Sequence, residues 1–266
     1  MAKRRGLGRS PGFGDRTGIC AVENAQLISL SRQVALQRQM DVVANNMANI
    51  GTTGFKASDI LFEDYLMPVA RDDTYVGRDR TLHFTQDFST VHDMRAGAIE
   101  PTGNPLDVAL MGDGFLTVET PDGPRFSRAG ALQIDAGGTL VDLNGNAVLG
   151  QSGPIRFDDS DVDITIGPDG TVNTNNGAKG RLAIVEFADP QVLARAGDTY
   201  FSGPAGTAAV ATRVMQGSIE RSNVSGVTEL TTMIRVQRAY QSLANLMQRQ
   251  DELRTSAIQR LGETRA

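Results

Sequence analysis

Apolar residues at helical spacing near both ends of the chain constrain its fold more than any other feature. No glycine or proline interrupts residues 23–49, where apolar side chains recur every three or four positions. The same spacing returns over residues 226–261. Stripes of this kind are typical of a coiled-coil seam. The two ends are therefore predicted to form long helices, which bury their stripes against each other or against other molecules.

The predicted assembly residues of the first helix, residues 22–50, are the apolar stripe and three asparagines: Leu27, Leu30, Val34, Leu36, Met40, Val43, Asn45, Asn46, Met47 and Asn49. Those of the last helix are Leu230, Met233, Val236, Tyr240, Leu243, Met247 and Leu253. Gly51, Gly54 and Phe55 follow the first helix and predict a hinge, at which the glycines supply unusual backbone dihedrals.

The asparagines are unexpected, because asparagine is unfavourable inside helices. Two interpretations stay open. In the first, small Ala44 and Ala48 allow close helix approach, while the amides hydrogen-bond across subunits and fix their register. In the second, the asparagines cap a fraying, solvated helix end.

Between the helices the pattern becomes that of a β domain. From about residue 105 to 215, β-type runs alternate with turn signals every ~8–12 residues. Asn144-Gly145 predicts a hairpin with a type I′ turn, and Pro168-Asp169-Gly170 predicts another. Residues 182–187 predict a central strand. Residues 51–104 lack sustained periodicity and predict an extended, partly hairpin-like connector.

The predicted fold class is therefore α+β. N- and C-terminal coiled-coil-type helices pair with each other and with neighbours, and they enclose a central antiparallel β domain. The predicted segments are a disordered basic leader (1–21), the first helix (22–50), the connector (51–104), the β domain (105–215) and the last helix (216–266).

Charge is distributed unevenly along the chain. Of 26 basic and 31 acidic residues, five and one lie within residues 1–21, which leaves 21 basic and 30 acidic residues elsewhere. Residues 22–266 are therefore acidic and unsuited to binding nucleic acid, because its phosphates need a basic face. The leader lacks the apolar stretch of a cleavable signal peptide. No apolar window is long enough to predict a membrane-spanning helix.

Residues that could support catalysis, metal binding or a cofactor are few or poorly placed. Cys20 is the one cysteine. His83 and His92 have no zinc-type spacing and are expected to face solvent. The Asp142–Asn146 stretch is interpreted as a turn rather than a calcium loop, because glycine is fourth instead of sixth. The acidic run Asp158, Asp159, Asp161 and Asp163 is predicted to be solvated. We expect no enzyme, no metal and no cofactor.

Three ordered blocks of sequence carry a family resemblance. Residues 44–56, Ala-Asn-Asn-Met-Ala-Asn-Ile-Gly-Thr-Thr-Gly-Phe-Lys, resemble the amino-terminal signature of the flagellar rod and hook family. The middle block is Thr102–Ala109, Gly112–Phe115 and Phe126–Gly130, and the carboxy-terminal block is Glu220–Val224, Glu229–Leu230, Met233–Ile234 and Gln237–Tyr240. Within the family, residues 23–43 look most like the proximal rod branch.

This resemblance implies a structural subunit of the basal-body rod in the periplasm. Its partners would be copies of itself and other rod proteins, including the distal rod protein, in a helical tube. The flagellar type III export apparatus would deliver it without a cleavable signal peptide. A distal rod or hook-type protein of the same family, or a secreted β-domain binding module, is the alternative.

Overall fold

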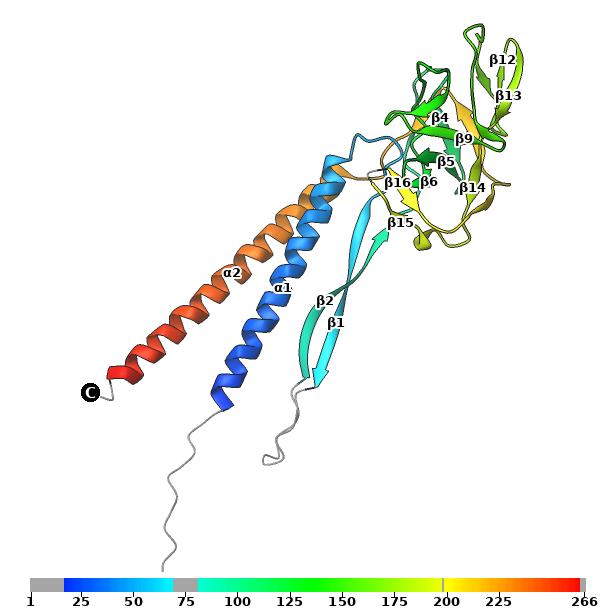
Figure 1. The fold of residues 1–266 in the computed structure, drawn as a ribbon. Coiled ribbons are helices and arrows are strands. Elements are labelled where there is room, and N and C mark those ends of the chain that lie inside the picture. Colours follow the sequence, from blue (N-terminus) through cyan, green and yellow to red (C-terminus); the bar gives the residue numbers. More distant parts are fainter. Residues whose placement is uncertain (1–16, 69–80, 198, 264–266) are drawn as a thin grey trace, which may run out of the picture. The chain divides into compact units, whose positions relative to one another are not determined.

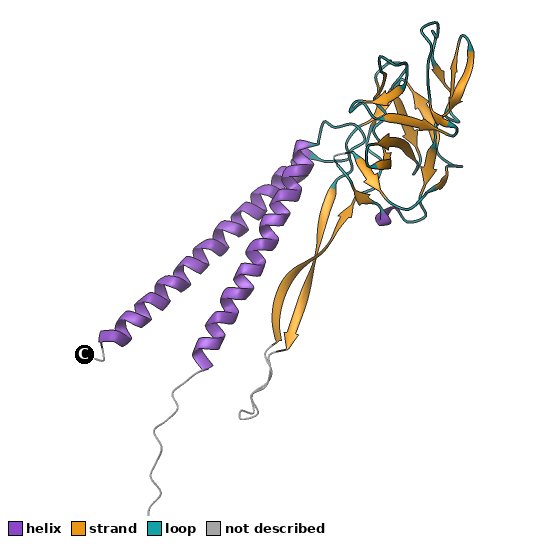
Figure 2. Ribbon diagram, viewed as in Figure 1, coloured by secondary structure: helices purple, strands orange, loops and turns teal. Residues whose placement is uncertain are grey.

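The computed structural model describes residues 17–68, 81–197 and 199–263, which fall into two compact units (Figure 1). The described residues of unit 1 are 17–37, 62–68, 81–87 and 238–263, and those of unit 2 are 38–61, 88–197 and 199–237. Two helices and a set of antiparallel strands make up the described chain (Figure 2). The predicted α+β class is thus confirmed for the helices and the central antiparallel domain, while coiled-coil packing stays a prediction.

The first helix, α1, spans Thr17–Ala48 and begins upstream of its predicted start at Val22. Residues 17–21 of the expected disordered leader are therefore helical. They contain no proline, which would break the helix, and their one glycine, Gly18, weakens a helix without ending it. Residues 1–16 of that leader lie outside the described residues.

The second helix, α2, spans Gly226–Glu263 and carries Glu229 in its first turn, where the helix dipole favours a negative charge. The predicted boundary at residue 216 is too early. Strand β19 (Ser218–Glu220) precedes the helix and pairs with β3 (Ile99–Pro101), so residues 216–225 belong with the β structure.

A hairpin lies within residues 51–104, the segment predicted as a connector. Strands β1 (Ser58–Pro68) and β2 (Thr81–His92) form a two-stranded sheet of their own. Strand β3 then leads the chain into the β domain beside β19, by which the chain leaves it. The domain is therefore closed at the point where the chain enters and leaves.

The strands of the β domain are short and pair antiparallel. Their bounds are β4 (Val108–Met111), β5 (Phe115–Thr120), β6 (Gly123–Ser127), β7 (Leu132–Ile134), β8 (Leu140–Asp142), β9 (Ala147–Gly150), β10 (Gly153–Pro154), β11 (Thr165–Ile166), β12 (Thr171–Thr174), β13 (Gly177–Arg181), β14 (Ile184–Glu186), β15 (Ala194–Arg195), β16 (Tyr200–Ser202), β17 (Thr207–Ala208) and β18 (Arg213–Gln216). A 3-10 turn, η1, spans Pro190–Val192.

The main sheet has the strand order β15-β16-β6-β5-β9-β8-β7, with β14 on β5, β17 on β14 and β10 on β9. Strands β11, β12 and β13 form a separate three-stranded sheet, and β18 pairs with β4. Alternate side chains of the strands meet in one apolar core, in which Leu116, Leu140 and Val172 are fully buried. A second, smaller cluster joins Phe115, whose ring contacts Phe201 edge to face, with Leu193 and Phe126.

The hairpin predicted at Asn144-Gly145 is present, but its turn is of a different type. Strands β8 and β9 pair through Val141 and Ala147, and only Gly145 of the two turn residues has a positive φ, of 83°. A type I′ turn needs positive φ at both. The Asp142 carboxylate instead accepts the backbone N–H groups of Asn144 and Asn146, which holds a longer loop.

Candidate assembly surface

Nine of the predicted stripe residues on the two helices are buried or half-buried. Val43 on α1 and Val236 on α2 are buried, and the stripe residues Leu36, Met40, Met47, Met233, Tyr240, Leu243 and Met247 are half-buried. The Gln33 amide donates a hydrogen bond of 2.9 Å to the Tyr240 hydroxyl. The Asn46 amide donates one of 3.3 Å to Glu229. These contacts show that the helices touch and run antiparallel.

Leu27, Leu30 and Val34 lie on another side of α1, although they precede this stripe at similar spacing. Val34 and Leu36 are two positions apart, which is a rotation of roughly 200° around a helix. The exposed residues continue the three-and-four spacing along what we term the outer face of α1: Leu27, Leu30, Val34, Gln37, Asp41, Ala44 and Ala48. Leu27 is 53% exposed. The predicted single stripe is thus two stripes.

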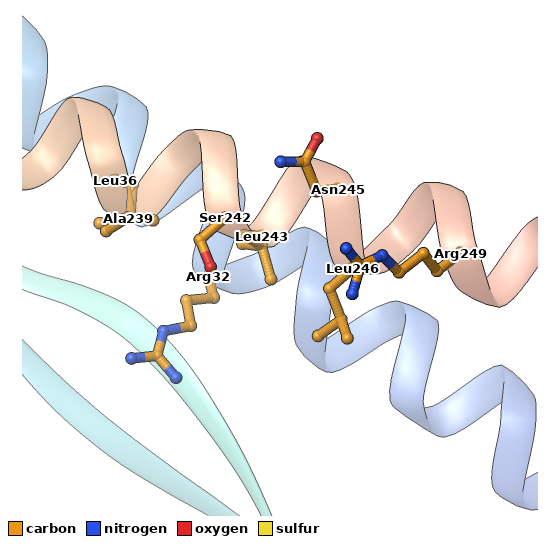
Figure 3. Close-up of a pocket in the computed structure, with 8 residues that line it drawn as sticks. All are labelled: Arg32, Leu36, Ala239, Ser242, Leu243, Asn245, Leu246 and Arg249. Atoms are coloured by element: carbon orange, nitrogen blue, oxygen red, sulfur yellow. The ribbon is translucent and has the colours of Figure 1, made fainter.

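A groove of about 470 Å³ runs along α2 beside α1 in unit 1 (Figure 3). Arg32 and Leu36 line it from α1, and the remaining lining residues come from α2: Ala239, Ser242, Leu243, Asn245, Leu246 and Arg249. We term the exposed α2 residues at alternate four-and-three spacing the groove face of α2: Arg235, Ala239, Ser242, Leu246, Arg249 and Leu253. Leu253 is 71% exposed.

The C-terminal end of α1 is held by the asparagines, but within the chain. The Asn46 side chain is buried, accepting the Ser58 N–H at 3.0 Å and donating to the Ser58 carbonyl at 2.8 Å. The Asn49 amide donates to the Asn45 carbonyl at 3.0 Å, which caps the helix. Asn45 is exposed. Cross-subunit bonding thus stays a prediction for Asn45 alone, since the amides of Asn46 and Asn49 are already engaged.

Three segments far apart in sequence meet at a buried ionic cluster. The Lys56 ammonium lies 2.6 Å from Glu220 Oε1, and the Arg128 guanidinium lies 3.3 Å from Glu220 Oε2. All three side chains are at most 2% exposed. Glu220 also accepts the Gly97 N–H at 2.9 Å. Burial lowers the pKa of Lys56, and the Glu220 carboxylate opposes that shift. One carboxylate therefore serves two buried cations.

Gly54 and Phe55, two of the three predicted hinge residues, are tightly packed against other segments, whereas Gly51 is not. Gly54 has φ of 68°, and a Cβ built on it would lie 2.3 Å from the Ala129 nitrogen. Phe55 is fully buried beneath the Arg195 guanidinium, which lies 4.5 Å from its ring centroid. Gly51 is exposed with open space around it. Of the three predicted hinge residues, Gly51 is the exposed one, and bending there stays a prediction.

The sequence did not predict the junction formed by Lys56, Arg128 and Glu220, because its members are single charged residues in segments far apart along the chain. The one available signal was that Lys56, Arg128 and Glu220 each end or begin a block of the family resemblance or lie within one. Asn223 belongs to the same junction, because its amide donates to the Asp93 carbonyl at 2.7 Å and accepts the Ala57 N–H at 2.7 Å.

Two polar groups expected to face solvent are buried instead. His92 is 7% exposed, and its Nδ1 lies 3.1 Å from the Ser58 hydroxyl. The Asp161 carboxylate is covered and pairs with the Lys179 ammonium at 2.6 Å. Lys179 supplies the counter-charge in the acidic run, so the run needs no metal there. His83 belongs to β2, and its side chain lies outside the described residues.

Among the described residues no grouping of histidine, cysteine and carboxylates could hold a metal ion. The described helices contain no stretch both apolar and long enough to cross a bilayer.

Three family models match the chain in order. Residues 27–56 match the flagella basal body rod protein model, and residues 109–174 match the flagellar hook protein FlgE/F/G D1 domain. Residues 215–260 match the flagellar basal body rod FlgEFG protein C-terminal model. Lys56 lies in the first matched segment and Glu220 in the last.

Curated relatives match over nearly their whole length. The flagellar basal-body rod protein FlgF of Caulobacter vibrioides is 34% identical over 91% of this chain and 99% of its own. FlgF of Mesorhizobium japonicum is 31% identical over 91% and 99%. The flagellar basal-body rod protein FlgG of Bacillus subtilis is 31% identical over 82% and 91%.

Proposed function

Because the chain belongs to the family of flagellar basal-body rod proteins that includes FlgF and FlgG, we propose that its two terminal helices build it into the rod. As a member of that family it is a structural subunit of the basal-body rod and not an enzyme. The observation that carries the proposal is the exposed apolar surface on both helices, which one copy leaves uncovered.

Burial of these side chains supplies the driving force for assembly. Leu27, Leu30 and Val34 on α1 are each about half exposed, as are Leu230 and Leu246 on α2. Fully burying such a side chain contributes roughly 1.5–3 kcal/mol. Several of them per copy, repeated along a filament, outweigh the entropy lost when the helix ends become ordered.

We propose further that the chain takes the proximal place in the rod, with other rod proteins as neighbours. Support comes from FlgF relatives whose own lengths are matched at 98–99%. The rod lies in the periplasm in this proposal, and the flagellar type III export apparatus delivers the chain there without a cleavable signal peptide. A distal place is the alternative, because FlgG relatives are also 30–33% identical.

Helix-dependent incorporation can be tested in basal bodies purified from cells that carry variants of the full chain. Val236→Asp places a charge at a buried position of α2, and we expect the chain to be missing from basal bodies and the cells to be non-motile. Val210→Asp is the matched control, because Val210 is 94% exposed in the β domain. Normal basal bodies in cells that lack the chain would refute the proposal.

A further inference from the structure

The exposed surfaces of α1 and α2 differ from each other, and this difference points to how copies join. The outer face of α1 carries large apolar side chains at Leu27, Leu30 and Val34. The groove face of α2 carries small residues, Ala239 and Ser242, beside Leu246. We propose that the outer face of α1 in one copy packs into the groove face of α2 in a second copy, a proposal that rests on the function proposed above.

The spacing and size of the side chains on the two faces support this packing. Both faces repeat with alternate steps of three and four residues, so their side chains stay in phase over several turns of antiparallel helix. Small residues leave holes between turns, and branched side chains fill holes of this kind as knobs. The groove face offers two such positions, and its Leu246 provides an apolar wall (Figure 3).

The two faces also carry opposite charges. Asp41 continues the outer face of α1, and Arg235 continues the groove face of α2. Both side chains are exposed, and neither has an ion pair or hydrogen bond among the described residues. Each is a charge that forms no ion pair with another described residue of its own copy, so a neighbouring copy can supply the partner.

Register brings these two charges to the same level. Within one copy Gln33 meets Tyr240 and Asn46 meets Glu229. Asp41 lies between the first members of these pairs on α1, and Arg235 lies between the second members on α2. A second copy set beside the first, at the same height and in the same direction, therefore places its Asp41 near Arg235.

Such a contact joins two different surfaces. A pair of copies therefore still has one outer face of α1 and one groove face of α2 uncovered. Contacts of this type generate rings or open helical filaments instead of closed dimers. Because the copies stand at the same height, repeating the contact adds copies side by side around an axis, as in one layer of a tube. It needs no additional binding site on the β domain.

A charge-swap series tests the pairing in cells that express the full chain. Asp41→Arg alone and Arg235→Asp alone are each expected to reduce the amount of chain in purified basal bodies by roughly tenfold, because like charges then face each other. The double variant is expected to restore it. Gln237→Asp is the control, since Gln237 is exposed and lies roughly 200° around the helix from Arg235. Double and single variants that are equally impaired would overturn the pairing.

Cross-linking provides a readout that does not depend on tolerance of charge changes. In a Cys20→Ala background, cells would express Asp41→Cys and Arg235→Cys on separate copies, so that only contact between copies yields a covalent dimer on oxidation. We expect dimers in basal bodies, and far fewer when Gln237→Cys replaces Arg235→Cys. Equal yields, or products whose size shows a different partner, would overturn the proposal. Incorporation without dimers would do so while leaving the rod function intact, whereas absence of the wild-type chain from basal bodies would refute both.

Discussion

At the scale of single residues, Glu220 is expected to contribute most to the stability of the folded protein. It neutralises part of the charge of Lys56 and Arg128, which are both buried. Removing one partner of a buried ionic cluster leaves a charge without water or counter-ion, which costs roughly 3–5 kcal/mol. A solvent-exposed ion pair is worth about 0–1 kcal/mol.

We therefore expect Glu220→Gln to lower the free energy of unfolding by roughly 3–5 kcal/mol, measured by urea titration of the monomer. Glu100→Gln is the control, because Glu100 pairs with Arg221 at 3.3 Å on the surface and its loss is expected to cost less than about 1 kcal/mol. Similar losses for the two variants would show that burial does not govern the cluster.

His92 predicts a pH dependence. Burial, and secondly the Arg195 charge, lower the pKa of His92 from 6.5 to about 4. The folded state thus favours neutral His92, and the unfolded state binds its proton more readily. This contribution to stability is complete above pH 6.5 and is lost as the pH falls toward about 4.

The measurement is a urea midpoint at pH about 7 and about 5 for the wild type and for His92→Gln. The wild type should lose more stability between these two conditions than the variant, in which no imidazole takes up a proton. An equal loss in both proteins would assign the acid sensitivity to the carboxylates.

At the scale of elements, the end of α1 depends on one side chain that bonds both backbone groups of Ser58. Asn46→Ala leaves the Ser58 N–H and carbonyl without this partner, and we expect a loss of roughly 1–3 kcal/mol in unfolding free energy. Asn45→Ala, on the exposed side of the same turn, should leave monomer stability within about 0.5 kcal/mol of wild type. Thermal unfolding of both monomers followed by circular dichroism distinguishes them.

Element types could be predicted from the sequence because their patterns are local. The three-and-four spacing identified both helices, and turn residues identified the hairpins at Asn144 and Pro168. The type of the first turn could not be predicted, since the Asp142 carboxylate decides it. The change of face between Val34 and Leu36 was present in the spacing, but it became evident only when exposure separated the two stripes.

The junction at Glu220 could not be predicted in the same way. Lys56, Arg128 and Glu220 are brought together by chain reversals over more than a hundred residues, and a lone charged residue carries no sign of burial. For the same reason, exposure of His92 and Asp161 was expected and is wrong. Polar residues are usually exposed, and only their tertiary partners reveal the exceptions.

At the scale of the whole molecule, protection should differ along each helix. Residues 38–48 and 226–237 include the buried side chains Val43, Asn46 and Val236. Residues 238–260 of α2 have none buried, and on α1 the apolar side chains of residues 27–34 are largely exposed. Isolated helix segments are marginal in water, so stability should decrease toward the free ends.

Hydrogen exchange of the dilute monomer, read by mass spectrometry of peptides, measures this gradient. We expect peptides from residues 238–260 to exchange at least about tenfold faster than those from 226–237, and both to slow after assembly. Uniform slow exchange along α2 in the monomer would contradict both this gradient and the need for neighbours.

The pairing of β3 with β19 has a consequence for how this architecture can change in size. The chain passes into the β domain and out of it through two adjacent strands, Ile99–Pro101 and Ser218–Glu220. The segment between these two strands is an insert. Because the strands pair, its two ends stay side by side whatever its length. We therefore expect the loop at residues 175–176 to tolerate enlargement. Descendants of such a chain could then acquire a larger or smaller β domain while their terminal helices stay unaltered.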